Sequence, residues 1–364
     1  MLFPSLIIRQ AKILVFYFLI CCPILKSSAQ QIDFTQYYSC VDFCYANDMI
    51  LTSDSGFLLT GNAWRFHGDN NGFLLKTDRN GNQLWIRQDS LPSNEEGLFV
   101  KETSNGNYLF GSWVLGSPSY TYVMLYDSSG LFLWDKTYYI PGGSLQLNSM
   151  IEINKEFYYF GSHSTDTTAS GVFIKTDFDG NIISPIISNT FLPGNLPTSV
   201  LPYGNNNIIL TGSVFDSTQS FYVPQIIVID TNCNIVWQRT YSSNYLSTGQ
   251  QICSTLDGGY LFSASASSGP NMLYKIDSLG NLIWSHFINA NSYSITINYI
   301  DTGTILVACN NIQLLWLDGF GQQINEENVL LSHPDVSIAK TLILKDKIVI
   351  GGGIHWGQDR KSVV

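Results

Sequence analysis

Charged residues are scarce in this chain, and basic residues are the scarcest among them. Only 13% of the 364 residues are charged, and 18 Lys and Arg stand against 28 Asp and Glu, for a formal net charge of −10. So acidic a chain lacks the positive surface that binds phosphate backbones or anionic lipid headgroups. Nucleic acid and membrane surfaces are therefore excluded as expected partners.

Constellations of catalytic or metal-binding residues are lacking as well. No serine lies in a Gly-x-Ser-x-Gly elbow, and the histidines are scattered without ligand spacing. Beyond residue 29 the cysteines are odd in number, which argues against a complete disulfide framework: Cys40, Cys44, Cys233, Cys253 and Cys309. A local bridge between Cys40 and Cys44 stays open. We expect no cofactor and no metal, and enzyme function is the disfavoured alternative.

Long apolar runs are lacking beyond the N-terminus. Arg9 and Lys12 precede the apolar run Ile13–Leu25, which is too short to span a membrane, and Ser27-Ser28-Ala29 fits a cleavage site. Residues 1–29 are therefore interpreted as a signal peptide, and residues 30–364 as one domain. Cleavage removes three basic residues and no acid, so the net charge falls from −10 to −13. We expect an exported protein with no further membrane insertion.

A short unit of Asp, Gly and Trp recurs along the chain. In its clearest copy Asp78 ends an apolar strand, Gly81 follows three residues later, and Trp85 lies in the next strand. Two more copies are complete: Asp127, Gly130, Trp134 and Asp277, Gly280, Trp284. Three copies replace one residue: Cys233 stands for Gly between Asp230 and Trp237, Ser184 for Trp after Asp177 and Gly180, and Asn325 for Trp after Asp318 and Gly321. The steps of 49, 50, 53, 47 and 41 residues between these Asp residues are typical of propeller blades.

An apolar strand ending in Gly or a small residue precedes each unit. It occurs seven times, once more than the unit itself: Ser55–Gly61, Gly106–Ser112, Phe157–Ser162, Ile208–Ser213, Gly259–Ser265, Gly303–Ala308 and Ile348–Gly353. With a further apolar run before each, every repeat holds about four strands. The sequence therefore predicts an all-β, seven-bladed β-propeller with four-stranded blades. The last blade has three strands, and Ile32–Tyr38 resembles the outer strand Leu133–Tyr139, so we expect the N-terminal strand to close it; truncation of the chain is the alternative.

Physical roles follow for the residues of the unit. Asp accepts hydrogen bonds from the turn, Gly takes a left-handed conformation, and Trp fills the gap between sheets. We expect Trp85, Trp134, Trp237 and Trp284 to be largely buried. At Cys233 the turn is expected either to tolerate strain or to shift its left-handed residue to a neighbouring Asn. A calcium site at Asp177–Asn181 is disfavoured because no downstream Glu follows.

The repeats resemble those of a known group of proteins. Phe173–Asp177 with Gly180-Asn181, and Gly258–Phe262, are similar to repeats of exported β-propeller proteins of Bacteroidota. Many of those carry a C-terminal sorting domain for type IX secretion, which is not found after this propeller; the resemblance implies a secreted or cell-surface location, or a periplasmic one without such a domain. Quinoprotein dehydrogenases and sialidases also have similar repeats, but the vicinal cysteines beside the quinone and the arginine triad are not matched.

The working face is expected where connections are long and variable. The second connection of each blade is interpreted as long, and these connections carry aromatic residues, Arg and His that suit protein or glycan surfaces. The candidate binding residues are Trp64, Arg65, His67, Trp113, Tyr120, Tyr222, His355 and Trp356. We therefore predict a monomeric, non-enzymatic binding or scaffolding module for protein or glycan. A structural cell-surface component and a propeller hydrolase or oxidoreductase are the alternatives.

Overall fold

The structure is a computed structural model, in which Thr35–Val364 form one unit. It describes residues 36–38, 43–64, 70–88, 93–184, 186–188, 198–266, 269–288, 295–301, 303–328, 336–344, 347–355 and 360–363. The predicted signal peptide and Cys40 lie outside these residues. No helix in the described part of the chain has the length and apolarity needed to cross a membrane.

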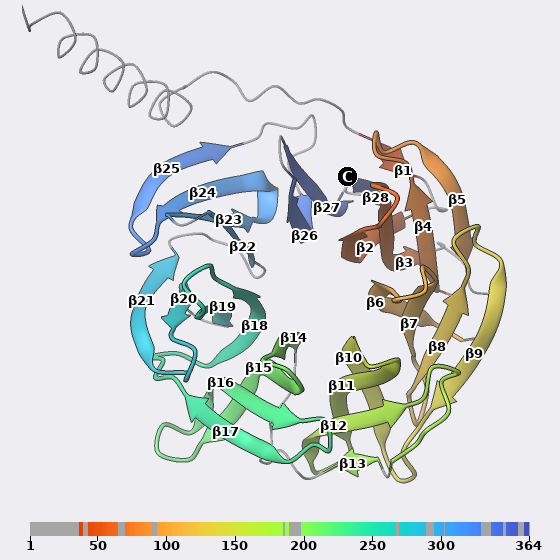
Figure 1. The fold of residues 1–364 in the computed structure, drawn as a ribbon, viewed down its shortest axis with the longest axis horizontal. Coiled ribbons are helices and arrows are strands. Elements are labelled where there is room, and N and C mark those ends of the chain that lie inside the picture. The colour runs from red at the N-terminus through yellow and green to blue at the C-terminus, as the bar shows by residue number, and fades with distance from the viewer. Residues whose placement is uncertain are drawn as a thin grey trace, which may run out of the picture. The chain divides into compact units, whose positions relative to one another are not determined.

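Strands are arranged around a central axis, with the first strand of each repeat innermost (Figure 1). The inner strands are β2 (Phe43–Leu51), β6 (Glu95–Glu102), β10 (Ser144–Ile153), β14 (Ser199–Tyr203), β18 (Ser247–Ser254), β22 (Ile295–Asp301) and β26 (Val336–Ile343). The second strands are β3 (Phe57–Trp64), β7 (Tyr108–Val114), β11 (Glu156–Ser164), β15 (Asn207–Asp216), β19 (Tyr260–Ala266), β23 (Thr304–Cys309) and β27 (Ile348–His355).

The third and fourth strands continue each repeat outward. The third are β4 (Asn71–Thr77), β8 (Tyr120–Tyr126), β12 (Ala169–Thr176), β16 (Phe221–Asp230), β20 (Asn271–Ile276), β24 (Gln313–Asp318) and β28 (Arg360–Val363). The fourth are β5 (Gln83–Gln88), β9 (Phe132–Tyr138), β13 (Ile187–Ser188), β17 (Ile235–Thr240), β21 (Leu282–Ile288), β25 (Gln323–Asn328) and β1 (Tyr37–Tyr38). A 3-10 turn, η1 (Asn310–Ile312), joins β23 to β24. The predicted all-β propeller is thus confirmed.

The predicted count of seven blades is wrong. Hydrogen bonding defines six sheets among the described residues, five of four strands and one of eight. The eight-stranded sheet arises because β2 pairs in parallel with β28, Phe43 opposite Arg360, which joins the first and last strand groups that the sequence separates. Within it, β1 pairs antiparallel with β28, Tyr37 opposite Val363. Residues 32–35 of the predicted N-terminal strand lie outside the described residues.

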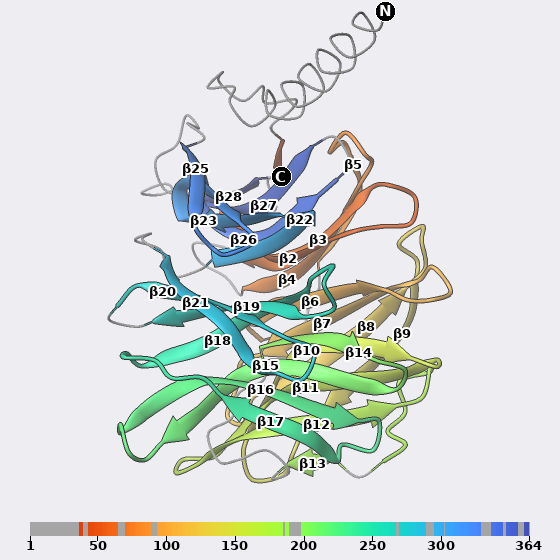
Figure 2. The ribbon, with the colours of Figure 1, turned by 60° about the vertical axis from the view of Figure 1, so that its left-hand side comes forward.

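Neighbouring sheets follow one another around the axis (Figure 2), and the core lies between them. One apolar cluster combines Leu109 and Val123 from the β6–β9 sheet with Tyr159 and Ile174 from the β10–β13 sheet. Because each inner sheet face meets a neighbour on both sides, middle strands are buried almost throughout, as β4 is from Gly72 to Thr77. This explains why the middle strands read as continuous apolar runs rather than as alternating ones.

Candidate binding surfaces

The Asp–Gly turns have the predicted chemistry. The Asp78 carboxylate accepts hydrogen bonds from the N–H groups of Asn80 (2.8 Å) and Asn82 (2.9 Å), and Gly81 has φ +79°. The Asn82 side-chain amide also donates to this carboxylate. That hydrogen bond is the main cause of a lowered pKa of Asp78, and the two backbone N–H groups add to it. At Asp177 the same bonds come from Asp179 and Asn181, so this carboxylate is occupied by its own turn.

Each complete turn also receives the outer strand of the preceding sheet. A Cβ at Gly180 would lie 2.9 Å from the Trp134 ring, so glycine is required here both by its φ of +75° and by this close approach. The Tyr138 hydroxyl donates to the Gly180 carbonyl at 2.8 Å, as Tyr241 does to Gly280. The four repeat Trp residues lie between sheets as predicted, but they are half-buried rather than largely buried.

A basic residue two positions after each Trp was missed by sequence reasoning. Arg87 donates to the Gly130 carbonyl at 2.7 Å and Arg239 to the Leu279 carbonyl at 3.1 Å. Lys136 donates to Asn181, and His286 contacts the Phe320 carbonyl, so all four residues reach the neighbouring turn. The Trp-x-basic spacing was available in the sequence as a signal. These four side chains therefore serve the joints between sheets.

Cys233 and Ser184 are two of the three departures from the unit, and they belong to consecutive repeats. Cys233 keeps an unshifted turn with φ +66°, which confirms the tolerated-strain alternative. Its buried side chain packs in the cluster of Tyr158 and Phe173. In the repeat, Ser184 takes the place of the Trp that elsewhere lies against the turn of the next sheet, as Trp134 does against Gly180. The one turn with a side chain at the Gly position therefore follows a repeat without that Trp.

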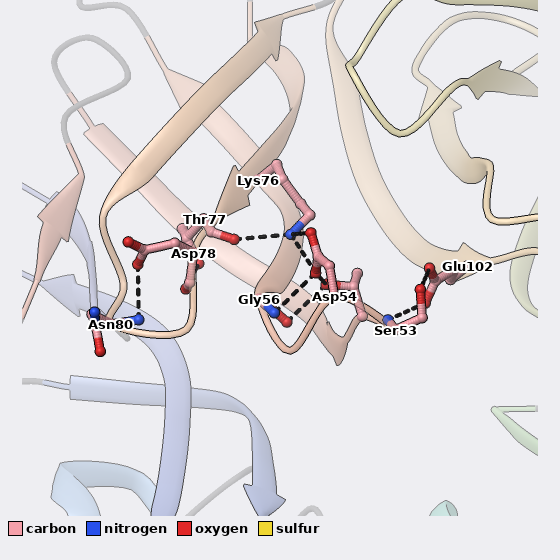
Figure 3. A network of polar contacts seen from close by, with 9 residues as sticks. Ser53, Asp54, Gly56, Lys76, Thr77, Asp78, Asn80 and Glu102 are labelled. Atoms are coloured by element: carbon pink, nitrogen blue, oxygen red, sulfur yellow. Dashed lines mark hydrogen bonds and ion pairs between the residues drawn. The ribbon is translucent and has the colours of Figure 1, made fainter.

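A second network lies at the same edge of the first repeat (Figure 3). The buried Lys76 ammonium binds Asp54 at 2.9 Å and the Thr77 carbonyl at 2.9 Å, and Ser53 donates to Glu102 of the next sheet. Burial opposes ionisation of Asp54, but hydrogen bonds from Lys76, Thr52 and Gly56 outweigh it and lower its pKa to about 2. Lys275 and Asp257 repeat this ion pair.

The eight predicted binding residues are only partly described. Arg65, His67 and Trp356 lie outside the described residues, and for Trp64 and His355 only the backbone is described, at the ends of β3 and β27. Trp113, Tyr120 and Tyr222 are half-buried and lie on β7, β8 and β16. The structure brings Trp113 and Tyr120 to one hairpin end, where β7 pairs with β8, and places Tyr222 on another.

The second connections are shorter than predicted because the strands pair further. Residues 115–119 join β7 to β8 and residues 217–220 join β15 to β16, no longer than residues 52–56 between β2 and β3. The β15–β16 hairpin is paired as far as Asp216 and Phe221. Tyr222 packs edge-on against Phe215, ring centroids 5.5 Å apart, and Phe215 is 47% exposed. This hairpin end presents an aromatic pair to solvent.

The inner strands share a bulge that sequence reasoning missed. Register shifts occur at equivalent places in five of them, β2, β6, β10, β18 and β26. The extra residues line one central cavity: Asn47, Leu98, Asn148, Gln250, Gln251 and Ala339. Opposite the bulge in β2 stands Gly61, where a Cβ would lie 1.9 Å from the Tyr45 carbonyl oxygen. The bulge thus explains the small residue at Gly61, and likewise at Gly161 and Gly352, where a Cβ would also lie 1.9 Å from a carbonyl oxygen of the inner strand.

The central cavity has a volume of about 380 Å³ and is lined from every inner strand. Its charged lining residues, within the described chain, are Asp48, Lys101 and Lys340. Lys340 lies 3.8 Å from Asp48, which also accepts N–H hydrogen bonds from Met49 and Val100. Burial and the nearby Lys340 lower the pKa of Lys101, while Asp48 opposes this shift. The lining thus brings two lysines and one carboxylate together inside an acidic protein.

Apolar residues are exposed in pairs on the outer strands β9, β17 and β21 and just before β13. The residues just before the repeat Trp, or its substitute, are exposed in four sheets: Phe132 and Leu133, Ile182 and Ile183, Ile235 and Val236, Leu282 and Ile283. Their exposed fractions run from 39% to 55%. We call these eight residues the rim pairs. Recurrent exposed apolar area on a protein of low charge marks a contact surface.

Comparison with known proteins identifies the fold class, a β-propeller. No family model matches the sequence, and no curated protein matches it. Among solved structures, BamB from Moraxella catarrhalis is 12% identical with a TM-score of 0.52, covering 92% of this chain and 99% of that one. YCF48 bound to D1 peptide is 15% identical with a TM-score of 0.52, covering 92% and 97%. Raptor from Chaetomium thermophilum is 11% identical with a TM-score of 0.58, covering 87% of this chain and 28% of that one.

Proposed function

We propose that this protein is an exported, non-enzymatic β-propeller that binds a protein or a glycan at the cell surface or in the periplasm. The rim pairs are the observation that carries this proposal, because exposed Ile, Leu, Val and Phe at equivalent positions lose water contact only when a partner covers them. A propeller of similar fold, YCF48, has been solved with a peptide bound. Export rests on the N-terminal signal sequence.

The hairpin ends form the second candidate surface. Trp113, Tyr120 and Tyr222 lie there, with Phe215 exposed beside Tyr222, and Trp64, Arg65, His67, His355 and Trp356 belong to the same connections in sequence. Aromatic rings with polar tips suit glycan stacking as well as protein contact. A protein partner is favoured by the rim pairs, and a glycan partner by the hairpin ends.

The test starts from purified residues 30–364, screened on a glycan array and against exported proteins of the source organism. Two variants then assign the surface: Ile235→Ser with Val236→Ser for the rim, and Trp113→Ala with Tyr222→Ala for the hairpin ends. Leu256→Ser is the matched control, since Leu256 is 71% exposed but belongs to neither surface. Each protein is checked for an unchanged circular dichroism spectrum.

We expect one variant to weaken binding by about tenfold or more while the control binds as the native chain does. Loss in the rim variant supports a protein partner, and loss in the hairpin variant with a positive glycan array supports a glycan. Binding that persists in both folded variants contradicts both surfaces. A chain that binds nothing in either screen contradicts the binding function and favours the structural alternative.

A further inference from the structure

The central cavity contains an ammonium group that nothing in the described chain neutralises. Lys101 lines the cavity from β6 and has no hydrogen-bond or ion-pair partner among the described residues. The charged groups that act on Lys101 are those of Asp48 and Lys340. The Asp48 carboxylate lies 3.8 Å from the Lys340 ammonium. With Lys101 protonated, one carboxylate stands against two ammonium groups and one positive charge is unmatched. Burial lowers the pKa of Lys101, so an anion bound beside it would stabilise its charged form.

The position of Lys101 is not required by the fold. Counting from the bulge, the equivalent places on β2, β10 and β26 hold Ile50, Ile151 and Leu342, and the one on β18 holds Cys253. An aliphatic side chain therefore satisfies the packing there, and a lysine costs desolvation free energy without contributing to the joint between sheets. A charge kept where the fold accepts an aliphatic residue indicates a ligand of opposite charge.

Uncharged donors also face the cavity. The Ser149 hydroxyl lies on β10, beside β6, and its oxygen has no hydrogen-bond partner in the described part of the chain. Cys253 adds no charge, because burial raises the pKa of its thiol to about 12. The volume of about 380 Å³ falls in the range of small-molecule sites.

We propose that the central cavity binds a carboxylate, held by the ammonium groups of Lys101 and Lys340 and by the Ser149 hydroxyl. A single unmatched positive charge suits a monovalent carboxylate, whereas a phosphate dianion would leave the cavity negative. The carboxylate is carried either by a small organic acid or by the C-terminus of a peptide. This site is separate from the rim pairs and the hairpin ends, and so stands independently of the proposed function.

The test is a titration of ¹⁵N-labelled residues 30–364 followed by backbone amide spectra. The probes are acetate, inorganic phosphate, and acetylated trialanine with either a free or an amidated C-terminus. We expect saturable shifts confined to inner-strand amides of β2, β6, β10 and β26. Shifts with acetate and not with the free peptide assign a small acid; tighter binding of the free than of the amidated peptide assigns a peptide C-terminus.

Variants make the assignment specific. Lys101→Met and Lys340→Met each weaken acetate binding about tenfold or more, because each removes a charge-assisted hydrogen bond. Asp48→Asn tightens it, since it removes the competing carboxylate, an outcome that a loss of structure does not produce. Lys136→Met, on the exposed outer strand β9, is the control for charge and leaves binding unchanged. Absent shifts with every probe, tighter binding of phosphate than of acetate, or equal affinities in all four variants overturns the proposal.

Discussion

The joints between sheets and the wall of the central cavity follow opposite rules. At the joints the same residues return from sheet to sheet: Tyr138 and Tyr241 each donate to a glycine carbonyl at 2.8 Å, and Tyr38 donates to Gly81 across the closing joint. On the cavity wall, equivalent positions differ in charge and size. In a repeat protein, what recurs is what the fold requires, and what varies is available for recognition.

The largest effect is expected from breaking a joint. Trp134→Ala removes a ring that packs against Gly180 and partly fills the gap between two sheets, so we expect a loss of about 3 kcal/mol in the free energy of unfolding. This is the low end for a tryptophan because Trp134 is half-buried. Denaturant unfolding measures it, and a loss below about 1 kcal/mol would contradict the role.

Adding one carbon at a joint comes next. Gly280→Ala places a Cβ 2.6 Å from the Trp237 ring at φ +80°, and we expect a loss of about 2–3 kcal/mol. Gly258→Ala is the matched control, because Gly258 has φ +82° but nothing lies within 4 Å of the new carbon. Its expected loss is only the cost of a left-handed backbone at a residue with a Cβ, about 1–2 kcal/mol. Equal losses in thermal or denaturant unfolding would show that the tryptophan contact does not require glycine.

Substitutions at Ser184 and Cys233 should have coupled effects on the free energy of unfolding. Ser184→Trp alone forces a ring against the Cys233 turn, and Cys233→Gly alone leaves an unfilled volume; together they rebuild the joint found at Trp134 and Gly180. We expect a favourable coupling of about 1 kcal/mol in a double-mutant cycle of unfolding free energies. Additive effects on the free energy of unfolding would mean that residues 184 and 233 do not interact.

Acid should weaken the edge network of the first repeat. The pKa of Asp54 falls from 3.8 to about 2 on folding, so its stabilising contribution is full above about pH 4 and is lost as the pH falls towards 2. The carboxylate is half-exposed, so the effect is below about 1 kcal/mol. Asp54→Asn, with Lys76→Leu to copy Asn105 and Leu125 of the next sheet, should flatten unfolding free energy over this window. If the unfolding free energy of the variant still falls with pH as it does in the native chain, the loss of stability in acid comes from other carboxylates.

The smallest effect on stability is expected in the cavity wall. Lys101→Met replaces a partly desolvated ammonium with a side chain like the Ile50 and Ile151 found at equivalent positions, so the free energy of unfolding should change by less than about 0.5 kcal/mol. Thermal unfolding beside the native chain checks this. A loss comparable to that of Trp134→Ala would place Lys101 among the residues the fold requires, and would remove the contrast between joint and wall.

Local chemistry could be predicted from the sequence, but distant contacts could not. The spacing of Asp78, Gly81 and Trp85 was sufficient for the turn, because each interaction in it lies within a few residues. The parallel pairing of Phe43 with Arg360, which changes the blade count, joins residues far apart in sequence and rests on one ladder position. The same holds for Asp48, Lys101 and Lys340, which carry no shared motif and meet only because three inner strands converge.

The bulges show the limit most clearly. Gly61 and Gly161 were visible as small residues at strand ends, yet their reason lies in the carbonyl oxygens of Tyr45 and Gln146, each 1.9 Å from where a Cβ would stand. A hydrophobic pattern records which face a residue occupies and not an added residue in the neighbouring strand. The cavity lining was therefore out of reach, although the fold class was not.

The pairing of Tyr37 with Val363 has a consequence for the order of events during synthesis. Every other sheet is built from strands that follow one another closely in sequence and are able to pair as soon as they leave the ribosome. The pairing of β1 with β28 needs both the earliest strand and Val363, so it forms only after the whole chain has been made. Bringing two such distant points of a free coil together costs about 5 kcal/mol of conformational entropy. Folding the intervening sheets first lowers that cost, because a half-built ring already holds its two ends near each other. Until the two ends pair, the partly folded ring exposes two unpaired strand edges, to which a chaperone could bind.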